Sequence, residues 1–191
     1  MRQRSSILPD LCQLPAALIR GGFLFFWLCC GTAAAQTDAG GTVDRFVAEA
    51  FAGRAPAPAA LWFTPALKAQ AREEAGFVPD TMRLRYWRNG NRTAWVIDRI
   101  GKEEPITFGV IVENDAIVAL QVLVYRESRG HEIRSPRWLA QFAGARTKPG
   151  GVDRRIDNVT GATLSVRAGI DVARLALFCH RTVTADAPAV P

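Results

Sequence analysis

The chain has 191 residues, 49% of them hydrophobic and 22% charged, values typical of one globular domain with its own core. The net charge of +6 is scattered along the chain rather than gathered into a basic stripe, so we expect no nucleic-acid partner. His131 and His180 lie far apart and lack other metal-ligating residues nearby, so we expect no metal site and place both at the surface or at a helix end.

Residues 1–35 are predicted to be a cleaved signal peptide. Three arginines precede an uncharged run from Gly21 to Ala35, which is shorter than the about 20 residues of a membrane span. The run ends in three alanines, which fit an A-x-A cleavage site. The expected location is therefore the periplasm, with an inner-membrane anchor as the alternative.

Residues 36–94 are predicted to form a helical and hairpin part of the domain. Apolar residues follow helical spacing from Val43 to Phe51, and a Pro/Ala-rich linker covers residues 52–60. A second helix is predicted to start at Pro65, with Thr64 as its N-cap and Gly76 as its stop.

The middle of the chain reads as antiparallel sheet. Four runs have strand patterns, and the Asn-Gly-Asn turn at 89–91 is typical of a hairpin. The last run is continuously apolar, which predicts a central strand covered on both faces. The runs cover residues 82–87, 93–100, 106–113 and 116–125.

A short helix and then a long one are predicted to complete the fold. Ser135 caps and Pro136 opens the short helix. Apolar spacing after Asp157 predicts a helix that packs on the sheet and ends near His180. Residues 182–191 are expected to form a flexible tail, and residues 95–181 the core of a single α+β domain, an antiparallel sheet packed with helices.

One cysteine, Cys179, remains after cleavage at Ala35, so the mature domain has no internal disulfide. Its neighbours are apolar, and we expect a buried, inert thiol.

The segment Asp157–Ser165, "DNVTGATLS", opens the long helix. A helix start offers free backbone N–H groups and a positive dipole end, which favour a phosphate. Gly161 allows close backbone approach, and Ala162 keeps the surroundings small. A threonine here could hold a phosphate or be esterified to one, although the pattern alone favours a simple capped helix start, because helices that start in Ser/Thr and Gly are common.

The motif D-x-x-T-G-A-T-x-S resembles the flavin-attachment motif of the FMN-binding domain family, which includes flavin subunits of Rnf and of sodium-translocating NADH:quinone reductase. The resemblance implies that Thr163 carries covalent FMN through a phosphoester bond installed by an FAD-dependent flavin transferase. Thr160, Gly161, Ala162 and Asp157 match the rest of the motif. The family often has a second small hydroxyl residue where this chain has Val166, which we interpret as a packing residue.

Two further segments are similar to the same family. "ESRG" places Glu127 and Gly130 on a motif that follows the central strand, and "QFAG" at 141–144 comes next in the expected order. The resemblance covers roughly residues 106–180. Glu127 is expected either to contact the flavin or to remain solvated. Four aromatic residues are candidates for shielding the flavin, although plain core packing fits each of them: Trp62, Trp95, Trp138 and Tyr125.

The resemblance implies an exported flavoprotein that relays electrons between membrane or periplasmic redox partners. No catalytic acid or base can be assigned, so an enzyme with its own substrate stays open, as does a subunit of a larger oxidoreductase. The alternative is a flavin-free binding or assembly module with the same fold.

Overall fold

The structure is a computed structural model that describes residues 39–185, which belong to one compact unit, Thr37–Pro191. The predicted signal peptide, residues 1–35, lies outside the described residues, and so does most of the predicted tail. None of the helices within residues 39–185 is both long enough and apolar enough to cross a membrane.

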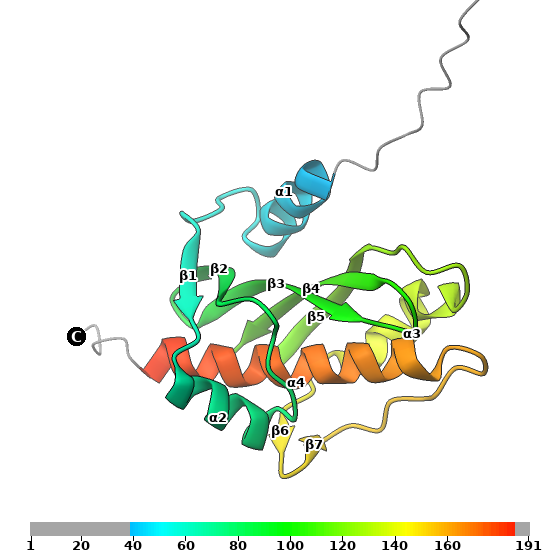
Figure 1. Cartoon of the computed structure of the whole chain (residues 1–191). Coiled ribbons are helices and arrows are strands. Elements are labelled where there is room, and N and C mark those ends of the chain that lie inside the picture. Colours follow the sequence, from blue (N-terminus) through cyan, green and yellow to red (C-terminus); the bar gives the residue numbers. More distant parts are fainter. Residues whose placement is uncertain (1–38, 186–191) are drawn as a thin grey trace, which may run out of the picture. The chain divides into compact units, whose positions relative to one another are not determined.

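A five-stranded antiparallel sheet forms the centre of the domain (Figure 1). Each strand pairs with the next along the chain, so the sheet is a meander whose order equals the sequence order. With helices packed against it, the domain has the predicted α+β fold. The strands are β1 Ala59–Trp62, β2 Arg83–Asn89, β3 Arg92–Ile100, β4 Pro105–Glu113 and β5 Ala116–Val124.

Two expectations about the sheet are wrong. β1 starts at Ala59, within the Pro/Ala-rich linker predicted at residues 52–60. It is a strand because its backbone pairs with β2 in the register Ala59↔Tyr86. β5 is an edge strand rather than a central one. Its run is apolar because both faces are still covered: Ile117 lies in the main core, and Leu123 packs on the opposite face.

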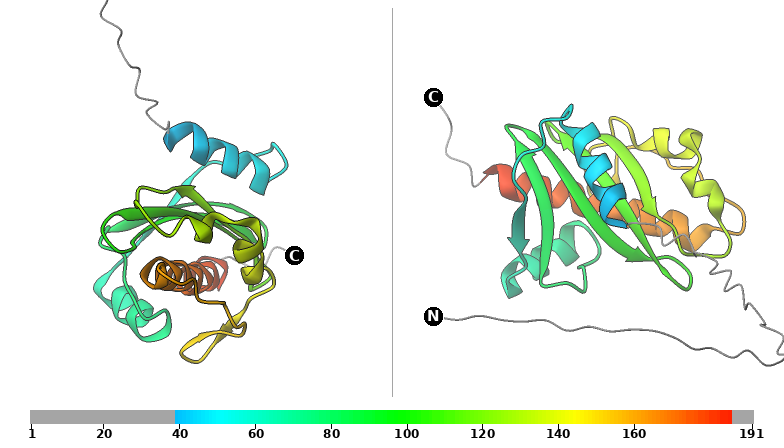
Figure 2. Two further views of the ribbon diagram at one scale, coloured as in Figure 1. Left: turned by 90° about the vertical axis from the view of Figure 1, so that its right-hand side faces the viewer. Right: turned by 90° about the horizontal axis from the view of Figure 1, so that it is seen from above.

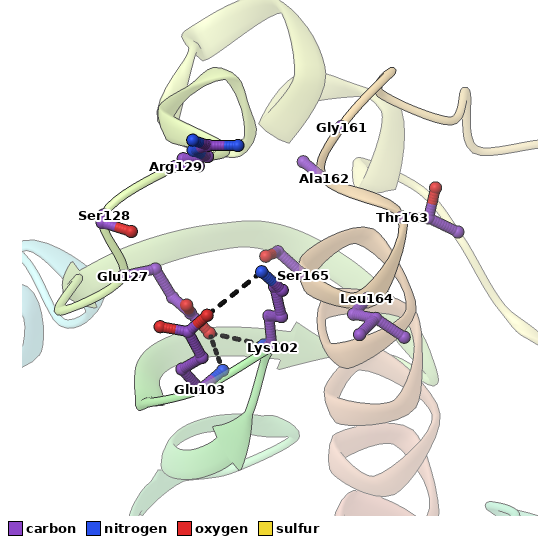
Figure 3. A pocket seen from close by; sticks show the side chains of 10 residues that line it. All are labelled: Lys102, Glu103, Glu127, Ser128, Arg129, Gly161, Ala162, Thr163, Leu164 and Ser165. Carbon is purple, nitrogen blue, oxygen red and sulfur yellow. Dashed lines mark hydrogen bonds and ion pairs between the residues drawn. The ribbon is translucent and has the colours of Figure 1, made fainter.

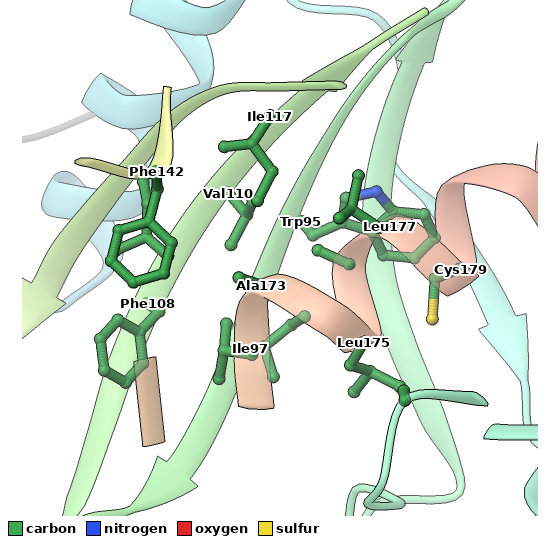
Figure 4. Packing of buried hydrophobic residues seen from close by; sticks show 14 of the residues in the cluster. Trp95, Ile97, Phe108, Val110, Ile117, Phe142, Ala173, Leu175, Leu177 and Cys179 are labelled. Carbon is green, nitrogen blue, oxygen red and sulfur yellow. The ribbon is translucent and has the colours of Figure 1, made fainter. Parts of the chain in front are cut away.

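The long C-terminal helix, α4 (Thr163–Ala185), covers one face of the sheet (Figure 2). Its buried residues meet the large side chains of β3 and β4, such as Trp95 and Phe108, in the main core (Figure 4). Cys179 is fully buried there, and this burial raises the pKa of its thiol, as expected for an inert cysteine. α4 continues five residues beyond the predicted end at His180.

The first helix, α1 (Ala39–Ala50), covers the opposite face of the sheet. Its apolar residues are buried as their spacing predicts. Phe46 lies so close to β4 that a Cβ atom on Gly109 would be 2.7 Å from the Phe46 ring. The absence of a side chain at position 109 therefore lets α1 approach the sheet.

Short elements complete the domain, and two of them are capped as predicted. The Thr64 hydroxyl accepts from the amide of Leu67, and the Ser135 hydroxyl accepts from the amide of Trp138. The elements are α2 Pro65–Glu74, the 3₁₀ helix η1 His131–Arg134, α3 Pro136–Leu139, the 3₁₀ helix η2 Ala140–Phe142, β6 Thr147–Lys148 and β7 Gly151–Val152.

His180 is not the surface or helix-end residue that the sequence predicts, because only 2% of it is exposed and α4 continues to Ala185. Its Nδ1 lies 2.8 Å from the hydroxyl oxygen of Thr93, which accepts a hydrogen bond from the indole N–H of Trp95. The Thr93 proton is thus free to point at Nδ1, which suits a neutral ring. Burial lowers the pKa of His180, and Asp115 opposes this only in part.

Candidate functional site

A cavity of about 460 Å³ lies at the N-terminal end of α4 (Figure 3). Three segments that are far apart in the sequence form its walls. They are the turn after β3, with Lys102 and Glu103, the loop after β5, with residues 127–129, and the start of α4, with residues 161–165. A cavity of this volume is within the range that holds a small ligand or cofactor.

Glu127 ties the first two walls together. Only 6% of the residue is exposed, and its Oε1 accepts hydrogen bonds from the amides of Lys102, Glu103 and Glu104, the last two at 2.9 and 3.3 Å. Burial acts to raise the pKa of this carboxyl, but the three amides outweigh it, so the pKa is lowered. Glu127 is therefore a buried anion whose charge is satisfied by backbone, not a solvated carboxylate.

The loop after β5 is fixed to the helix start by two contacts. Gly130, with φ of 83°, packs directly on Ala162. The Tyr125 hydroxyl donates to the carbonyl of Arg129 and lies beside the buried hydroxyl of Ser165. Burial raises the pKa of Tyr125, although the Ser165 hydroxyl acts in the opposite direction. The phenol is consequently neutral and serves as a clamp.

The start of α4 presents free backbone donors to the cavity. The Val166 amide donates to the Ala162 carbonyl, and the Ala162 amide donates to the Val159 carbonyl. The amides of residues 163–165 lie between these two bonds, before the first hydrogen bond of the helix. Gly161 has φ of 82°, and a Cβ atom built there would meet nothing within 4 Å. An anion can therefore approach this backbone closely, near the cations Lys102 and Arg129 that line the same cavity.

Thr163 is the first residue of α4, and it is exposed. Its hydroxyl accepts a hydrogen bond of 3.3 Å from the side-chain amide of Asn158. Its side chain points away from Glu127 and Ser128, while its backbone borders the cavity (Figure 3). The hydroxyl is thus accessible to a reagent from solvent and stands at the rim of the cavity.

The predicted site residues divide into three groups. Glu127, Gly161, Ala162 and Thr163 line the cavity, and Gly130 lies behind them against Ala162. Thr160 and Asp157 do not line it.

Asp157 instead takes part through its backbone. Its backbone amide donates to the side-chain oxygen of Gln141 at 2.8 Å, so this N–H is not free to bind a ligand. Its carbonyl accepts from the indole N–H of Trp138 at 3.0 Å. These two bonds fix the segment that leads into the helix start. The Gln-Phe-Ala-Gly segment therefore contacts the motif through Gln141.

Sequence reasoning did not single out several lining residues. Lys102 and Glu103 belong to a turn with no motif of its own, and only the contact with Glu127 reveals them. Ser128 and Arg129 lie inside the "ESRG" segment, and this motif could have indicated that they line the cavity. Leu164 and Ser165 likewise lie inside the helix-start motif.

The four aromatic candidates are dispersed. Tyr125 lies at the site, whereas Trp95 is buried in the main core and stacks on Tyr86 with 4.7 Å between ring centroids. Trp138 packs behind the helix start on Gly169, and Trp62 is exposed on β1. Tyr125 contacts Arg129, which lines the cavity.

Val166, which departs from the family pattern, is buried in the core as the packing interpretation requires. Within residues 39–185, no three His, Cys, Asp or Glu side chains gather into a group that could hold a metal ion.

Residues 101–177 match the family model described as the FMN-binding domain. The matched range starts at Gly101, next to the turn, and includes the loop after β5 and the start of α4, so it contains all three walls of the cavity. No curated protein matches the chain. No solved structure matches it either.

Proposed function

Because the chain carries an FMN-binding domain over residues 101–177, we propose that it is an exported electron-transfer protein with FMN bound covalently to Thr163. The observation that supports this is the position of Thr163, whose exposed hydroxyl stands at a helix start on the rim of a cavity of about 460 Å³. A bound flavin supplies the capacity to take up and release electrons.

The residues at the helix start fit a phosphate group. The free amides at the beginning of α4 and the positive end of its dipole favour an anion. Arg129 adds positive charge at the same cavity, whereas the charge of Lys102 is paired with Glu103 at 3.1 Å, and Gly161 leaves the backbone open to approach. The carboxylate of Glu127 does not oppose the phosphate strongly, because three backbone amides already satisfy it.

The side chains around the cavity act mainly by holding its walls in place. Glu127 fixes the turn at 102–104, and the packing of Gly130 on Ala162 fixes the loop to the helix. A cofactor tethered at Thr163 would remain at a high effective concentration beside these walls even outside the cytoplasm. The chain would then orient the flavin and set its potential, without supplying a catalytic acid or base.

Partners and location form part of the same proposal. An FAD-dependent flavin transferase would join the Thr163 oxygen to the flavin phosphate, with release of AMP and of the hydroxyl proton. The electron partners would be membrane or periplasmic redox proteins. Export is supported by the arginines, the short apolar run and the three alanines that end at Ala35. A retained inner-membrane anchor is the alternative.

The test is to express the full chain with and without a flavin transferase in a host that exports it. Intact mass and in-gel fluorescence under denaturing conditions then report covalent flavin. Thr163→Val keeps the side-chain shape and removes the hydroxyl, so we expect the covalent signal to disappear. Thr160→Val is the matched control, since Thr160 lies outside the cavity lining, and it should keep most of the signal.

Two outcomes contradict the proposal in different ways. Loss of the signal in Thr160→Val with retention in Thr163→Val would move the attachment by three residues along the chain. A parent chain that never gains flavin beside an active transferase would instead favour the flavin-free binding or assembly module.

A further inference from the structure

The positive charge of the domain gathers in one segment and is not scattered evenly as the sequence suggested. Residues 39–125 hold ten lysines and arginines and ten carboxylates, so their charges cancel. Residues 126–167 hold nine lysines and arginines against four carboxylates, which gives this segment a net charge of +5. The segment begins at the end of β5 and reaches the first turns of α4. The net charge of the domain therefore comes mainly from this part of the chain.

The nine cations of this segment are exposed, and their charges are not neutralised. In the part of the chain that the structure describes, none of the nine forms an ion pair. Two of them donate to backbone carbonyls, which leaves their charge in place. Of the four carboxylates, Glu127 is buried and satisfied by backbone amides. The other three are exposed and stand against all nine cations: Glu132, Asp153 and Asp157.

This segment surrounds the proposed attachment point. The loop after β5, with η1 and α3, lies at the same end of the domain as the start of α4 (Figure 1 and Figure 2). Trp138 of α3 bonds the carbonyl of Asp157, and Arg129 lines the candidate cavity (Figure 3). On α4, Arg167 lies about one turn after Thr163, and both residues line a groove of about 490 Å³. The cations are therefore arranged around Thr163.

Neither the other walls of the cavity nor a bound phosphate would cancel this charge. Lys102 and Glu103 pair with each other at 3.1 Å, which leaves Glu104 as a single exposed carboxylate of that turn. A phosphodiester on Thr163 would carry a single negative charge. Of the nine cations, only Arg129 lines the cavity, so the others are not needed to hold a phosphate there. The remaining charge is available to a larger partner.

We propose that the exposed cations of residues 126–167 form a basic face that docks an acidic redox protein. The inference rests on the proposed function, because a protein that exchanges electrons with a flavin at Thr163 has to dock beside this residue. Eight of the nine cations are arginines. Arginine is enriched at protein interfaces, where lysine is depleted, and its guanidinium group binds a carboxylate through two parallel hydrogen bonds. Complementary charge would also steer the partner toward this face.

An anionic membrane would be attracted by the same charge, but the basic face is poor in apolar side chains that could enter a bilayer. Among residues 126–167, all of which the structure describes, Leu164 is the one large apolar side chain that is exposed, at 46%. A segment that lies in a membrane surface usually presents a broad apolar side together with its cations. The composition of the basic face therefore favours an acidic protein over a membrane.

Binding of two haem proteins to the flavin-free full chain tests the docking surface. The probes are the soluble domain of cytochrome b5, which is acidic, and cytochrome c, which is basic. Arg134→Glu combined with Arg137→Glu reverses two exposed cations of the basic face that do not line the cavity. Arg45→Glu combined with Arg54→Glu is the matched control, since both residues are exposed and lie in or just after α1. Each pair lowers the net charge by four, and exposed substitutions of this kind should leave the fold intact.

We expect cytochrome b5 to bind the parent at low ionic strength and to bind the control variant with an affinity within about twofold of the parent. It should bind the variant with Arg134→Glu and Arg137→Glu about tenfold more weakly. Cytochrome c should not bind. Absence of cytochrome b5 binding to the parent, equal losses in the two variants, or binding of cytochrome c would each overturn the proposal.

Vesicles that contain phosphatidylglycerol test the membrane alternative in a sedimentation assay. Vesicle binding that is lost in the variant with Arg134→Glu and Arg137→Glu would assign the basic face to a membrane and overturn the proposal. Equal vesicle binding by this variant and the parent would support a protein partner. None of these measurements needs flavin on Thr163, so failure of flavin attachment would count against the proposed function and leave the result on docking in place.

Discussion

Gly130 lies directly against Ala162: a Cβ atom on Gly130 would stand 2.8 Å from the Cβ of Ala162 and 2.9 Å from the hydroxyl oxygen of Tyr125. The backbone at Gly130 also has φ of 83°, a left-handed conformation that side chains disfavour. This contact joins the loop after β5 to the start of α4. The two motifs that carry the family resemblance therefore form one packed unit.

Gly130→Ala should lower both stability and flavin incorporation. The added methyl group would collide with Ala162, and the left-handed backbone adds about 1 kcal/mol. Gly150→Ala is the matched control, because Gly150 has φ of 75° and nothing within 4 Å of its Cβ position. Urea unfolding should show a larger loss for Gly130→Ala, and equal losses would mean that the contact with Ala162 is unimportant.

Glu127 should make the domain sensitive to acid. Its pKa is lowered in the folded state, so its contribution is complete above its ordinary pKa of about 4.3 and is lost as the pH falls through the lower folded value. Glu127→Gln keeps an oxygen for the turn amides but cannot titrate. The free energy of unfolding should therefore fall less steeply below about pH 4.5 in Glu127→Gln than in the parent.

The control for that measurement is Glu73→Gln, which removes a carboxylate from an exposed position on α2. The free energy of unfolding of this variant should fall with decreasing pH as it does in the parent. A parent-like profile for Glu127→Gln as well would show that the buried carboxylate does not carry the acid response.

His180 should produce a second, separate pH effect. Burial lowers the pKa of His180 in the folded state, so the unfolded chain takes up a proton at a higher pH than the folded chain does. The free energy of unfolding therefore falls as the pH drops below about 6.5, until the folded-state pKa is reached. His180→Gln should flatten the change in unfolding free energy between about pH 7 and pH 5. His131→Gln, at an exposed position, should leave the change in place. If the unfolding free energy changed equally with pH in the two variants, His180 would not be the source of this pH effect.

The packing of α1 depends on the bare backbone of Gly109. Gly109→Ala would force the Phe46 ring to move, at a cost of about 1–3 kcal/mol in unfolding free energy. Gly151→Ala should cost less, because its new methyl group would make only an ordinary contact of 3.7 Å with Lys148. Phe46→Leu combined with Gly109→Ala should recover part of the loss, and strict additivity of the two changes would argue against direct contact.

Local chemistry made most of the fold predictable. The Asn-Gly turn, the cap at Thr64 and the apolar spacing of α1 all depend on neighbouring residues, and the structure confirms each of them. β1 could not be predicted because its Ala-rich sequence becomes a strand only by pairing with β2. The edge position of β5 could not be predicted for a similar reason. An apolar sequence shows that both faces of a strand are covered, but not whether a neighbouring strand pairs with each of its two edges.

The candidate site was predictable where residue identity carries the motif. Glu127, Gly161, Ala162 and Thr163 were named from the sequence, and all four line the cavity. The turn at Lys102 was missed because its tie to Glu127 uses backbone amides, which every sequence has. His180 was misplaced because its partners, Thr93 and Trp95, become neighbours only when α4 packs on β3.

The convergence of three distant segments on one cavity also fixes when the cavity can exist. The turn after β3 and the loop after β5 are synthesised well before the start of α4, which supplies the last wall together with Thr163. A nascent or prematurely terminated chain that stops before α4 therefore lacks both the complete cavity and the proposed attachment point. Cofactor loading would be a late step of maturation, and the presence of flavin would mark chains that were completed through this helix.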